Sequence, residues 1–366
     1  MYPVSLPNWT TQAIVGLISA GCLIIAFFIS FYHYNRKKYR PFLFLTLGPF
    51  LTIFMSLLYA FSVLFLSIPL IRASVYTFIP IGFFNILLLD SMSRETVDPV
   101  KILALGMISV ALLFVSLDPS SFYINMFPNG EWRIYLGDNF LIVASPFFIL
   151  IGTLYVYYAA KIYRDAPKEL KIQALVFLLG GIITGFLSPG SLAIRLNDII
   201  PAIHMILFAI GVLISSNTLA SQPKLAYILP FKVLRLAIIN TNSGVPLYTH
   251  IWEGSERTED MIDPMLFSGM MHTISQFVQE SLKKGNVTEI HLEEAILILE
   301  RSEQFPIVCV LISTKSSQIL RQNLNYFAKR FFEEFSQYFS DMSNLSNFAT
   351  ASDLVLEYFP FVPEYD

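Results

Sequence analysis

Residues 12–40 read QAIVGLISAGCLIIAFFISFYHYNRKKYR, and this stretch decides what kind of protein the chain is. Its first part, Gln12–Tyr32, carries no charged residue and is long enough to cross the ~30 Å hydrocarbon core of a bilayer as a helix. Four basic residues follow at positions 36–40, and lysines and arginines gather on the cytoplasmic side of membrane helices. No basic residue precedes Gln12, so the segment is expected to be a retained helix and not a cleaved signal peptide.

Apolar runs of the same kind recur along residues 1–217. The predicted spans are Gln12–Tyr32, Pro41–Phe65, Ala73–Leu89, Lys101–Leu117, Asn139–Tyr158, Ile172–Leu187 and Ile199–Ser215. The sequence therefore predicts a polytopic α-helical membrane bundle of about seven transmembrane helices over residues 1–217. Only Leu66–Arg72 joins the second and third spans, which predicts a tight helical hairpin. Prolines are expected to interrupt four of the helices, at Pro49, Pro80, Pro146 and Pro201.

Basic residues in the connecting segments predict the orientation of the bundle. One side collects ten of them, Arg36, Lys37, Lys38, Arg40, Arg94, Lys101, Lys161, Arg164, Lys168 and Lys171. The opposite side has three, Arg72, Arg133 and Arg195. The richer side is expected to be cytoplasmic, which places the N-terminus outside and the C-terminus in the cytoplasm of a multi-pass membrane protein. Six or eight spans would instead place the C-terminal domain outside.

Charge is scarce, and its distribution changes along the chain. Charged residues make up 14% of the sequence, against about 25% in a typical soluble domain. They are spread evenly only from Lys224 onward. The net charge of −3 comes without a basic stripe, which excludes nucleic acid as an expected partner. Cys22 and Cys309 fall in different predicted domains and are interpreted as small packing residues.

Few polar groups lie inside the predicted spans, and these are the candidates for a ligand site. His204 follows Pro201 within the last span and is a candidate ligand-binding residue, as is Asn85 in the third span. A histidine there could sense pH or hold an anionic ligand; the alternative is a neutral imidazole that hydrogen-bonds a neighbouring helix. Asp90 and Asp198 lie near helix ends, so no chain of buried acids indicates an ion path.

The bundle lacks the signatures of two familiar seven-helix classes. Its last span has no lysine to hold retinal, and the sequence motifs of G-protein-coupled receptors are absent from the chain. Between Tyr155 and Gly185, an aromatic helix end is followed by a basic loop and a glycine-rich helix. In this layout the bundle resembles the seven-helix sensor modules at the front of some prokaryotic histidine kinases. No kinase domain follows, because the remaining residues are too few.

The C-terminal part alternates strands and helices. After a linker at residues 218–231, a cytosolic α/β domain is predicted over residues 232–366. Its predicted strands are Val233–Asn240, Leu247–Trp252, Val287–Glu293, Ala295–Arg301 and Pro306–Ser313. Its predicted helices are Pro264–Leu282, Ser317–Tyr338 and Asp353–Phe359. The last three strands follow one another so closely that they are expected to form an antiparallel meander, and Gly244 is expected to take a positive φ in the turn between the first two.

This order of elements carries a resemblance to a known superfamily. The opening phrase runs Leu236-Ala237-Ile238-Ile239, then Gly244-Val245-Pro246-Leu247-Tyr248, as a strand, a glycine turn and a second strand. The domain resembles the longin and roadblock superfamily of profilin-like domains. The resemblance implies a five-stranded antiparallel sheet with helices, no catalysis, dimerisation, and a role as a platform for small Ras-like GTPases or for regulators in trafficking and signalling complexes.

The predicted helix Pro264–Leu282 has an apolar stripe wider than one sheet face needs. Either the helix is deeply buried or it also forms a seam with a second protein, in a homodimer or a heterodimer. The candidate interface residues are Leu266, Phe267, Met270, Met271, Ile274 and Phe277.

The sequence contains no recognisable catalytic or metal-binding motif. No pair of its five histidines has metal-ligand spacing, and phosphate loops and nucleophile elbows are absent, so neither an enzyme nor a cofactor is expected. The predicted function is a membrane-anchored receptor-like or scaffold protein whose longin-like domain dimerises and recruits a small GTPase or another trafficking or signalling partner. The alternative is a transporter or channel with a regulatory tail, which the scarcity of buried charge and the odd number of helices disfavour.

Overall fold

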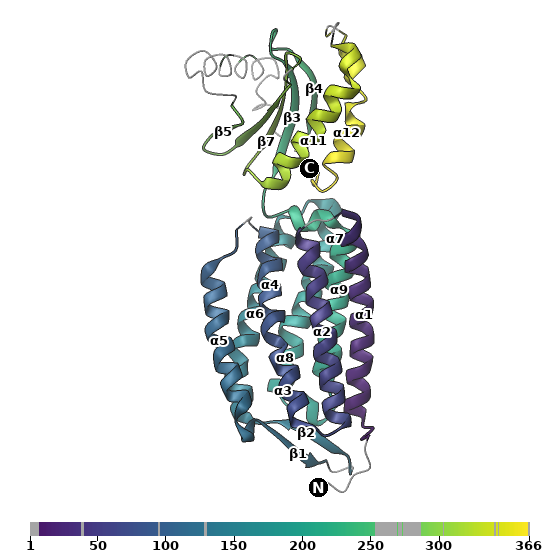
Figure 1. Ribbon diagram of the computed structural model, residues 1–366, viewed down its shortest axis with the longest axis vertical. Helices are drawn as coiled ribbons and strands as arrows, with labels where there is room; N and C mark the ends of the chain where they lie inside the picture. Colours follow the sequence, from purple (N-terminus) through teal and green to yellow (C-terminus); the bar gives the residue numbers. More distant parts are fainter. Residues whose placement is uncertain are drawn as a thin grey trace. The chain divides into compact units, whose positions relative to one another are not determined.

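The chain divides into two compact units, a helical bundle that ends at Ala226 and a second unit that begins at Tyr227. The structure is a computed structural model (Figure 1). It describes residues 7–37, 40–93, 96–127, 130–252, 269, 273, 287–302, 304–339, 342 and 344–364. The two units are described separately below.

The first unit is built from long apolar helices. These are α1 (Thr11–Lys37), α2 (Arg40–Leu64), α3 (Ile68–Tyr76), α4 (Phe78–Ser93), α5 (Pro99–Leu117), α6 (Asp138–Asp165), α7 (Lys171–Ile182), α8 (Ser188–Ala193) and α9 (Ile203–Ser221). The helices α3 and α4 together form one span, and α7 and α8 form another with the π-helical segment η3 (Ile183–Leu187) between them. Within the described residues, seven segments are thus long and apolar enough to cross a bilayer, as predicted. By length and composition these are the spans of a multi-pass membrane protein.

The third and last spans begin at other residues than predicted, and proline explains both; the fifth and sixth run past their predicted ends, to Asp165 and Ala193. The third span begins at Ile68, five residues before the predicted Ala73, because a proline in the first turn of α3 suits a helix start. The last span begins at Ile203, so Pro201 lies in the preceding turn and interrupts no helix. Pro49 and Pro146 lie inside α2 and α6, as expected.

A β-hairpin that the sequence did not predict covers one end of the bundle. Its strands, β1 (Phe122–Met126) and β2 (Trp132–Leu136), pair antiparallel between α5 and α6. Gly130 makes the turn possible with a φ of +86°. The hairpin is fixed to the start of the chain, since the Asn8 side chain donates to the Trp132 carbonyl over 2.9 Å. Figure 1 shows β1 and β2 at the end of the bundle where α1 begins.

Glycines bring helices into close contact within the bundle. A Cβ added to Gly152 in α6 would lie 2.2 Å from the carbonyl oxygen of Gly185 in η3, and one on Gly181 would lie 2.7 Å from the ring of Tyr155. Gly152, Gly181 and Gly185 thus allow close packing between the helices.

The second unit is a five-stranded antiparallel sheet with helices, as predicted. Its strands are β3 (Val233–Asn240), β4 (Pro246–Ile251), β5 (Glu289–His291), β6 (Ile296–Arg301) and β7 (Ile307–Ser313), in the order β4-β3-β7-β6-β5. Every neighbouring pair is antiparallel. Gly244 takes a φ of +70° in the turn between β3 and β4, as expected. Cys309 is fully buried in β7, and burial raises the pKa of its thiol, which fits a packing residue.

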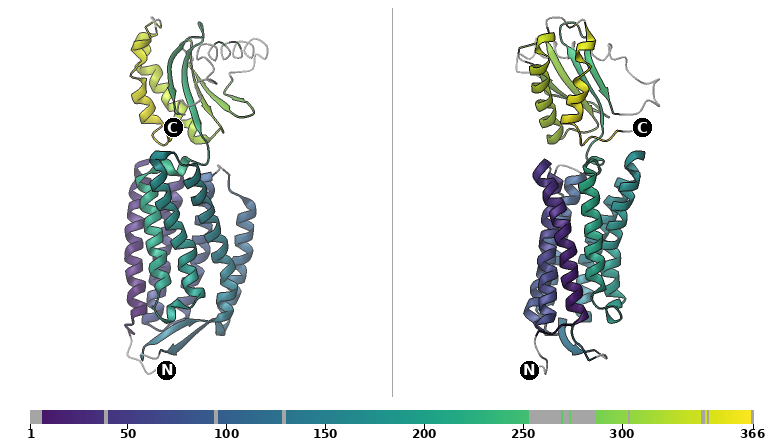
Figure 2. Two further views of the ribbon diagram at one scale, coloured as in Figure 1. Left: turned by 180° about the vertical axis from the view of Figure 1, so that it is seen from behind. Right: turned by 90° about the vertical axis from the view of Figure 1, so that its right-hand side faces the viewer.

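Two described helices, α11 (Gln318–Glu334) and α12 (Ala351–Tyr358), pack on this sheet (Figure 2). Phenylalanines form their core: the Phe331 ring stacks on Phe335 at 4.6 Å and packs against Phe348. Apart from Gly269 and Thr273, the predicted helix Pro264–Leu282 lies outside the described residues. So do all six candidate interface residues, Leu266, Phe267, Met270, Met271, Ile274 and Phe277.

Candidate ligand-binding site

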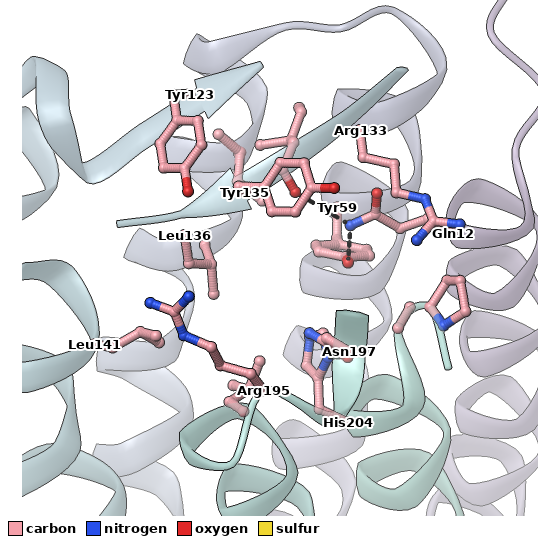
Figure 3. Close-up of a pocket in the computed structure, with 15 residues that line it drawn as sticks. Gln12, Tyr59, Tyr123, Arg133, Tyr135, Leu136, Leu141, Arg195, Asn197 and His204 are labelled. Carbon is pink, nitrogen blue, oxygen red and sulfur yellow. Dashed lines mark hydrogen bonds between the residues drawn. The ribbon is translucent and has the colours of Figure 1, made fainter. Parts of the chain in front are cut away.

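The β1–β2 hairpin covers a cavity of about 150 Å³ in the end of the bundle (Figure 3). Its walls come from α1, α2, α3, both strands of the hairpin, α6, α8, the segment that joins α8 to α9 and the start of α9. The lining residues are Gln12, Tyr59, Ile71, Tyr123, Arg133, Ile134, Tyr135, Leu136, Leu141, Leu192, Arg195, Asn197, Pro201, Ala202 and His204. His204, predicted from the sequence as a ligand-binding residue, thus lies in the wall of a cavity.

The backbone that places His204 adopts an uncommon conformation twice. Arg195 and Ala202, both non-glycine residues, have φ values of +52° and +56°. A non-glycine residue in this left-handed conformation costs free energy. It persists where the surrounding structure fixes it, and such residues are often found at functional sites. They turn the chain between α8 and α9 so that Asn197 and His204 both reach the cavity.

His204 is buried and held by two contacts. Its Nδ1 lies 3.0 Å from Oδ1 of Asn197, and its ring meets the Tyr59 ring edge-on, with centroids 5.6 Å apart. Because an amide oxygen accepts, Nδ1 is assigned as the donor, which leaves Nε2 as an acceptor. The alternative prediction, a neutral imidazole bonded to a neighbouring segment, therefore also describes this residue, and the two interpretations are compatible.

Gln12 is the polar group in the cavity whose hydrogen bonding is incomplete. Its Nε2 donates to the Tyr59 hydroxyl over 2.7 Å and lies 3.4 Å from the Ile134 carbonyl oxygen. Its Oε1 is buried and has no partner among the described residues. A buried acceptor without a donor costs about 1–3 kcal/mol, which a bound donor would recover.

Two arginines give the cavity a positive character. Arg133 is buried, donates to Glu131 over 2.7 and 3.2 Å, and lies 3.7 Å from the centre of the Phe127 ring. Arg195 pairs with Asp138 and is largely exposed. Among the described residues that line the cavity, none is acidic. Both guanidiniums pair with an acid, so an anionic oxygen group of a ligand would share or replace these partners, while Gln12 Oε1 is open to a donor.

Asn85, the other candidate residue, does not join this site. Its Nδ2 donates to the Ile81 carbonyl of its own helix over 3.0 Å. It lines a smaller cavity of about 40 Å³, together with Tyr155, Thr184 and Ser215. The Thr184 and Ser215 hydroxyls are buried without a partner among the described residues. A volume of this size is enough for a water molecule.

Sequence reasoning missed most of the site. Gln12, Tyr59, Arg133 and Arg195 were not predicted as ligand-binding residues. The available signal was the alternation of apolar and polar side chains along Trp132–Leu136, just after Gly130. Such alternation is typical of a hairpin strand, and it would have placed Arg133 in a strand at one end of the bundle.

Among the described residues, no group of three or more histidine, cysteine, aspartate or glutamate side chains is placed to hold a metal ion. No family model, no curated protein and no solved structure matches the chain. The arrangement of the site itself therefore carries the functional argument.

Proposed function

We propose that this protein is a membrane receptor, in which the helical bundle binds a small ligand beneath the β1–β2 hairpin and the C-terminal unit passes the signal to a protein partner. The observation that carries the proposal is the buried, unpartnered Oε1 of Gln12 in a cavity lined by His204 and two arginines. Polar groups inside a membrane domain cost free energy. Their grouping around one cavity therefore favours a role in ligand binding over a role in helix packing alone.

The C-terminal unit is proposed as the signalling platform. Support comes from the resemblance to the longin and roadblock superfamily and from the five-stranded antiparallel sheet with its helices. The partner that this resemblance implies is a small Ras-like GTPase or another trafficking or signalling protein. Dimerisation through the helix Pro264–Leu282, with itself or with another chain, stays a prediction from the sequence.

Signalling across a membrane requires the two ends of the protein to face different compartments. The ten-to-three distribution of basic residues supports a cytoplasmic C-terminus. A reporter fused after Asp366 is therefore expected to be active in the cytoplasm, and one fused to a chain truncated after Arg195 is expected to be active on the opposite side. Reporter activity on the outer side after Asp366 would contradict the proposed orientation.

The binding half of the proposal is tested with the full chain in lipid nanodiscs. A small-molecule library is screened for binding by native mass spectrometry, and each hit is measured on His204→Phe. This change keeps an aromatic ring and removes both ring nitrogens, so a ligand in the cavity is expected to bind at least tenfold more weakly, equivalent to about 1.4 kcal/mol.

Asn85→Leu is the matched control, because it removes a polar side chain from the separate small cavity and is expected to leave affinity unchanged. A ligand that binds wild type and His204→Phe equally would contradict the cavity as its site. The signalling half is tested by adding the ligand and measuring the binding of small Ras-like GTPases to the full chain in their GTP and GDP states. A ligand-dependent change in that affinity is expected.

A further inference from the structure

An apolar groove lies directly beside the candidate ligand cavity. It has a volume of about 210 Å³ and runs between α6 and the segment formed by η3 and α8. Its lining residues are Leu141, Ser145, Phe148, Ile149, Gly185, Phe186, Pro189, Gly190, Leu192 and Ala193. Leu141 and Leu192 line both the groove and the cavity, so the two spaces share a wall.

The glycine contact described above explains why the groove exists. Gly152 and Gly185 hold α6 and η3 at backbone contact distance. One wall of the groove is formed by residues of α6 that precede Gly152. The other wall is formed by Gly185 and residues that follow it. The groove therefore extends from the glycine contact toward the hairpin. Within it, the π-helical turn of η3 contributes Gly185 and Phe186.

The groove belongs to the surface that a bilayer would cover. Ile149 is 59% exposed and Phe186 is 42% exposed, and both lie in segments that are apolar enough to cross a membrane. Ser145 and Ala193 are exposed as well. A hydrocarbon chain in the groove would therefore be in contact with both the protein and the lipid.

The cavity end of the groove carries a positive charge. Arg195 follows Leu192 by three residues, and Figure 3 shows its guanidinium near Leu141, directed toward the cavity. Its partner Asp138 has a side chain that is 67% exposed. An ion pair between two exposed side chains contributes little, so a carboxylate ligand can share or replace Asp138.

We propose that the cavity and the groove form one binding site for a long-chain fatty acid, with its carboxylate at Arg195 and its hydrocarbon chain between α6 and α8. This inference rests on the proposed receptor function and names the chemical class of its ligand. A groove that shares Leu141 and Leu192 with a cavity lined by two arginines, with no acid among the described lining residues, fits one chain with one anionic oxygen head, and the planar guanidinium matches a carboxylate.

The test uses cis-parinaric acid, a fluorescent fatty acid, with the full chain in nanodiscs and empty nanodiscs as the background. Trp132 on the hairpin excites the bound probe by energy transfer, which separates bound probe from probe dissolved in lipid. The methyl ester of the probe has the same chain without the charge. We expect the ester to bind at least tenfold more weakly than the acid. Butyrate has the carboxylate but only a short hydrocarbon chain, and we expect it to compete poorly with the probe.

Substitutions in the groove, beside it and at Arg195 test where the probe binds. Ala193→Phe and Ser145→Phe fill the groove, and each is expected to weaken the binding of the acid at least tenfold. Ile194→Phe is the matched control, because Ile194 is 74% exposed and does not line the groove; its affinity is expected to stay within twofold of wild type. Arg195→Asn removes the charge while tolerating the left-handed backbone, and it is expected to weaken the acid tenfold and leave the ester unchanged.

Three results would overturn the inference: an ester that binds as tightly as the acid, wild-type affinity in both groove-filling variants, or binding of lysophosphatidic acid without binding of the fatty acid. Failure of the receptor function would instead leave no ligand whose binding depends on His204, whereas failure of the fatty-acid inference alone gives another result. A water-soluble ligand that depends on His204 but is indifferent to Ala193→Phe would keep the receptor and exclude the fatty acid.

Discussion

Gly152→Leu is expected to abolish the folded bundle. The Cβ of any side chain at this position would lie 2.2 Å from the carbonyl oxygen of Gly185 and 2.9 Å from its carbonyl carbon. These are backbone atoms, so relief requires α6 and η3 to separate, and the packing along both helices is lost with them. We expect a destabilisation above about 4 kcal/mol, at the extreme of single substitutions.

Gly106→Leu is the matched control for this prediction. Gly106 lies in α5, where a Cβ would meet no atom within 4 Å. Leucine is a better helix former than glycine, so this variant is expected to be as stable as wild type or more stable by up to about 1 kcal/mol. Size-exclusion profiles and thermal unfolding in detergent measure both variants. A monodisperse Gly152→Leu protein with wild-type unfolding temperature would refute the helix contact.

Lys101→Met is expected to cost about 3–5 kcal/mol, because it removes the ammonium that pairs with a buried carboxylate. Asp90 in α4 has a side chain that is only 1% exposed and forms an ion pair with Lys101 of α5. The Lys101 ammonium also donates to the Tyr158 hydroxyl of α6 over 2.8 Å. The pair and this hydroxyl therefore link three helices, and the cost is measured as the free energy of unfolding in mixed micelles.

A double variant separates the ion pair from the packing of its side chains. Asp90→Asn combined with Lys101→Met removes both charges and is expected to recover much of the lost stability, since a buried pair replaced on both sides is often close to neutral. Arg164→Met is the surface control: Arg164 is 74% exposed where it pairs with Asp165, and its loss is expected to cost under about 1 kcal/mol. Equal effects of Lys101→Met and Arg164→Met would exclude a structural role for the buried pair.

The spans and the sheet could be predicted from the sequence because both depend on patterns along a short stretch. Gln12–Tyr32 is mostly apolar and carries no charged residue, which leaves a membrane helix as the structure that satisfies its backbone. In the same way, Val233–Asn240 and the glycine turn after it determine a strand and its partner locally.

The candidate site was harder to predict because it depends on contacts between distant segments. Gln12 and Tyr59 meet across two helices, and Ile134 joins them only because an unpredicted hairpin folds over the bundle. His204 was found because a lone histidine stands out in an apolar span. Asn85 stood out equally, yet it bonds to its own helix, and periodicity cannot distinguish these two situations.

The packing of α1 against α9 has a consequence for how the protein is made. Of the seven described spans, the one that begins with α1 is synthesised before the others and packs against α9, which is synthesised after them, and the wall that contains Asn197 and His204 emerges only with α9. The bundle can close only after α9 has been inserted. During synthesis the cavity is therefore completed only when α9 is in place, so a chain that stops before α9 can occupy the membrane without this cavity.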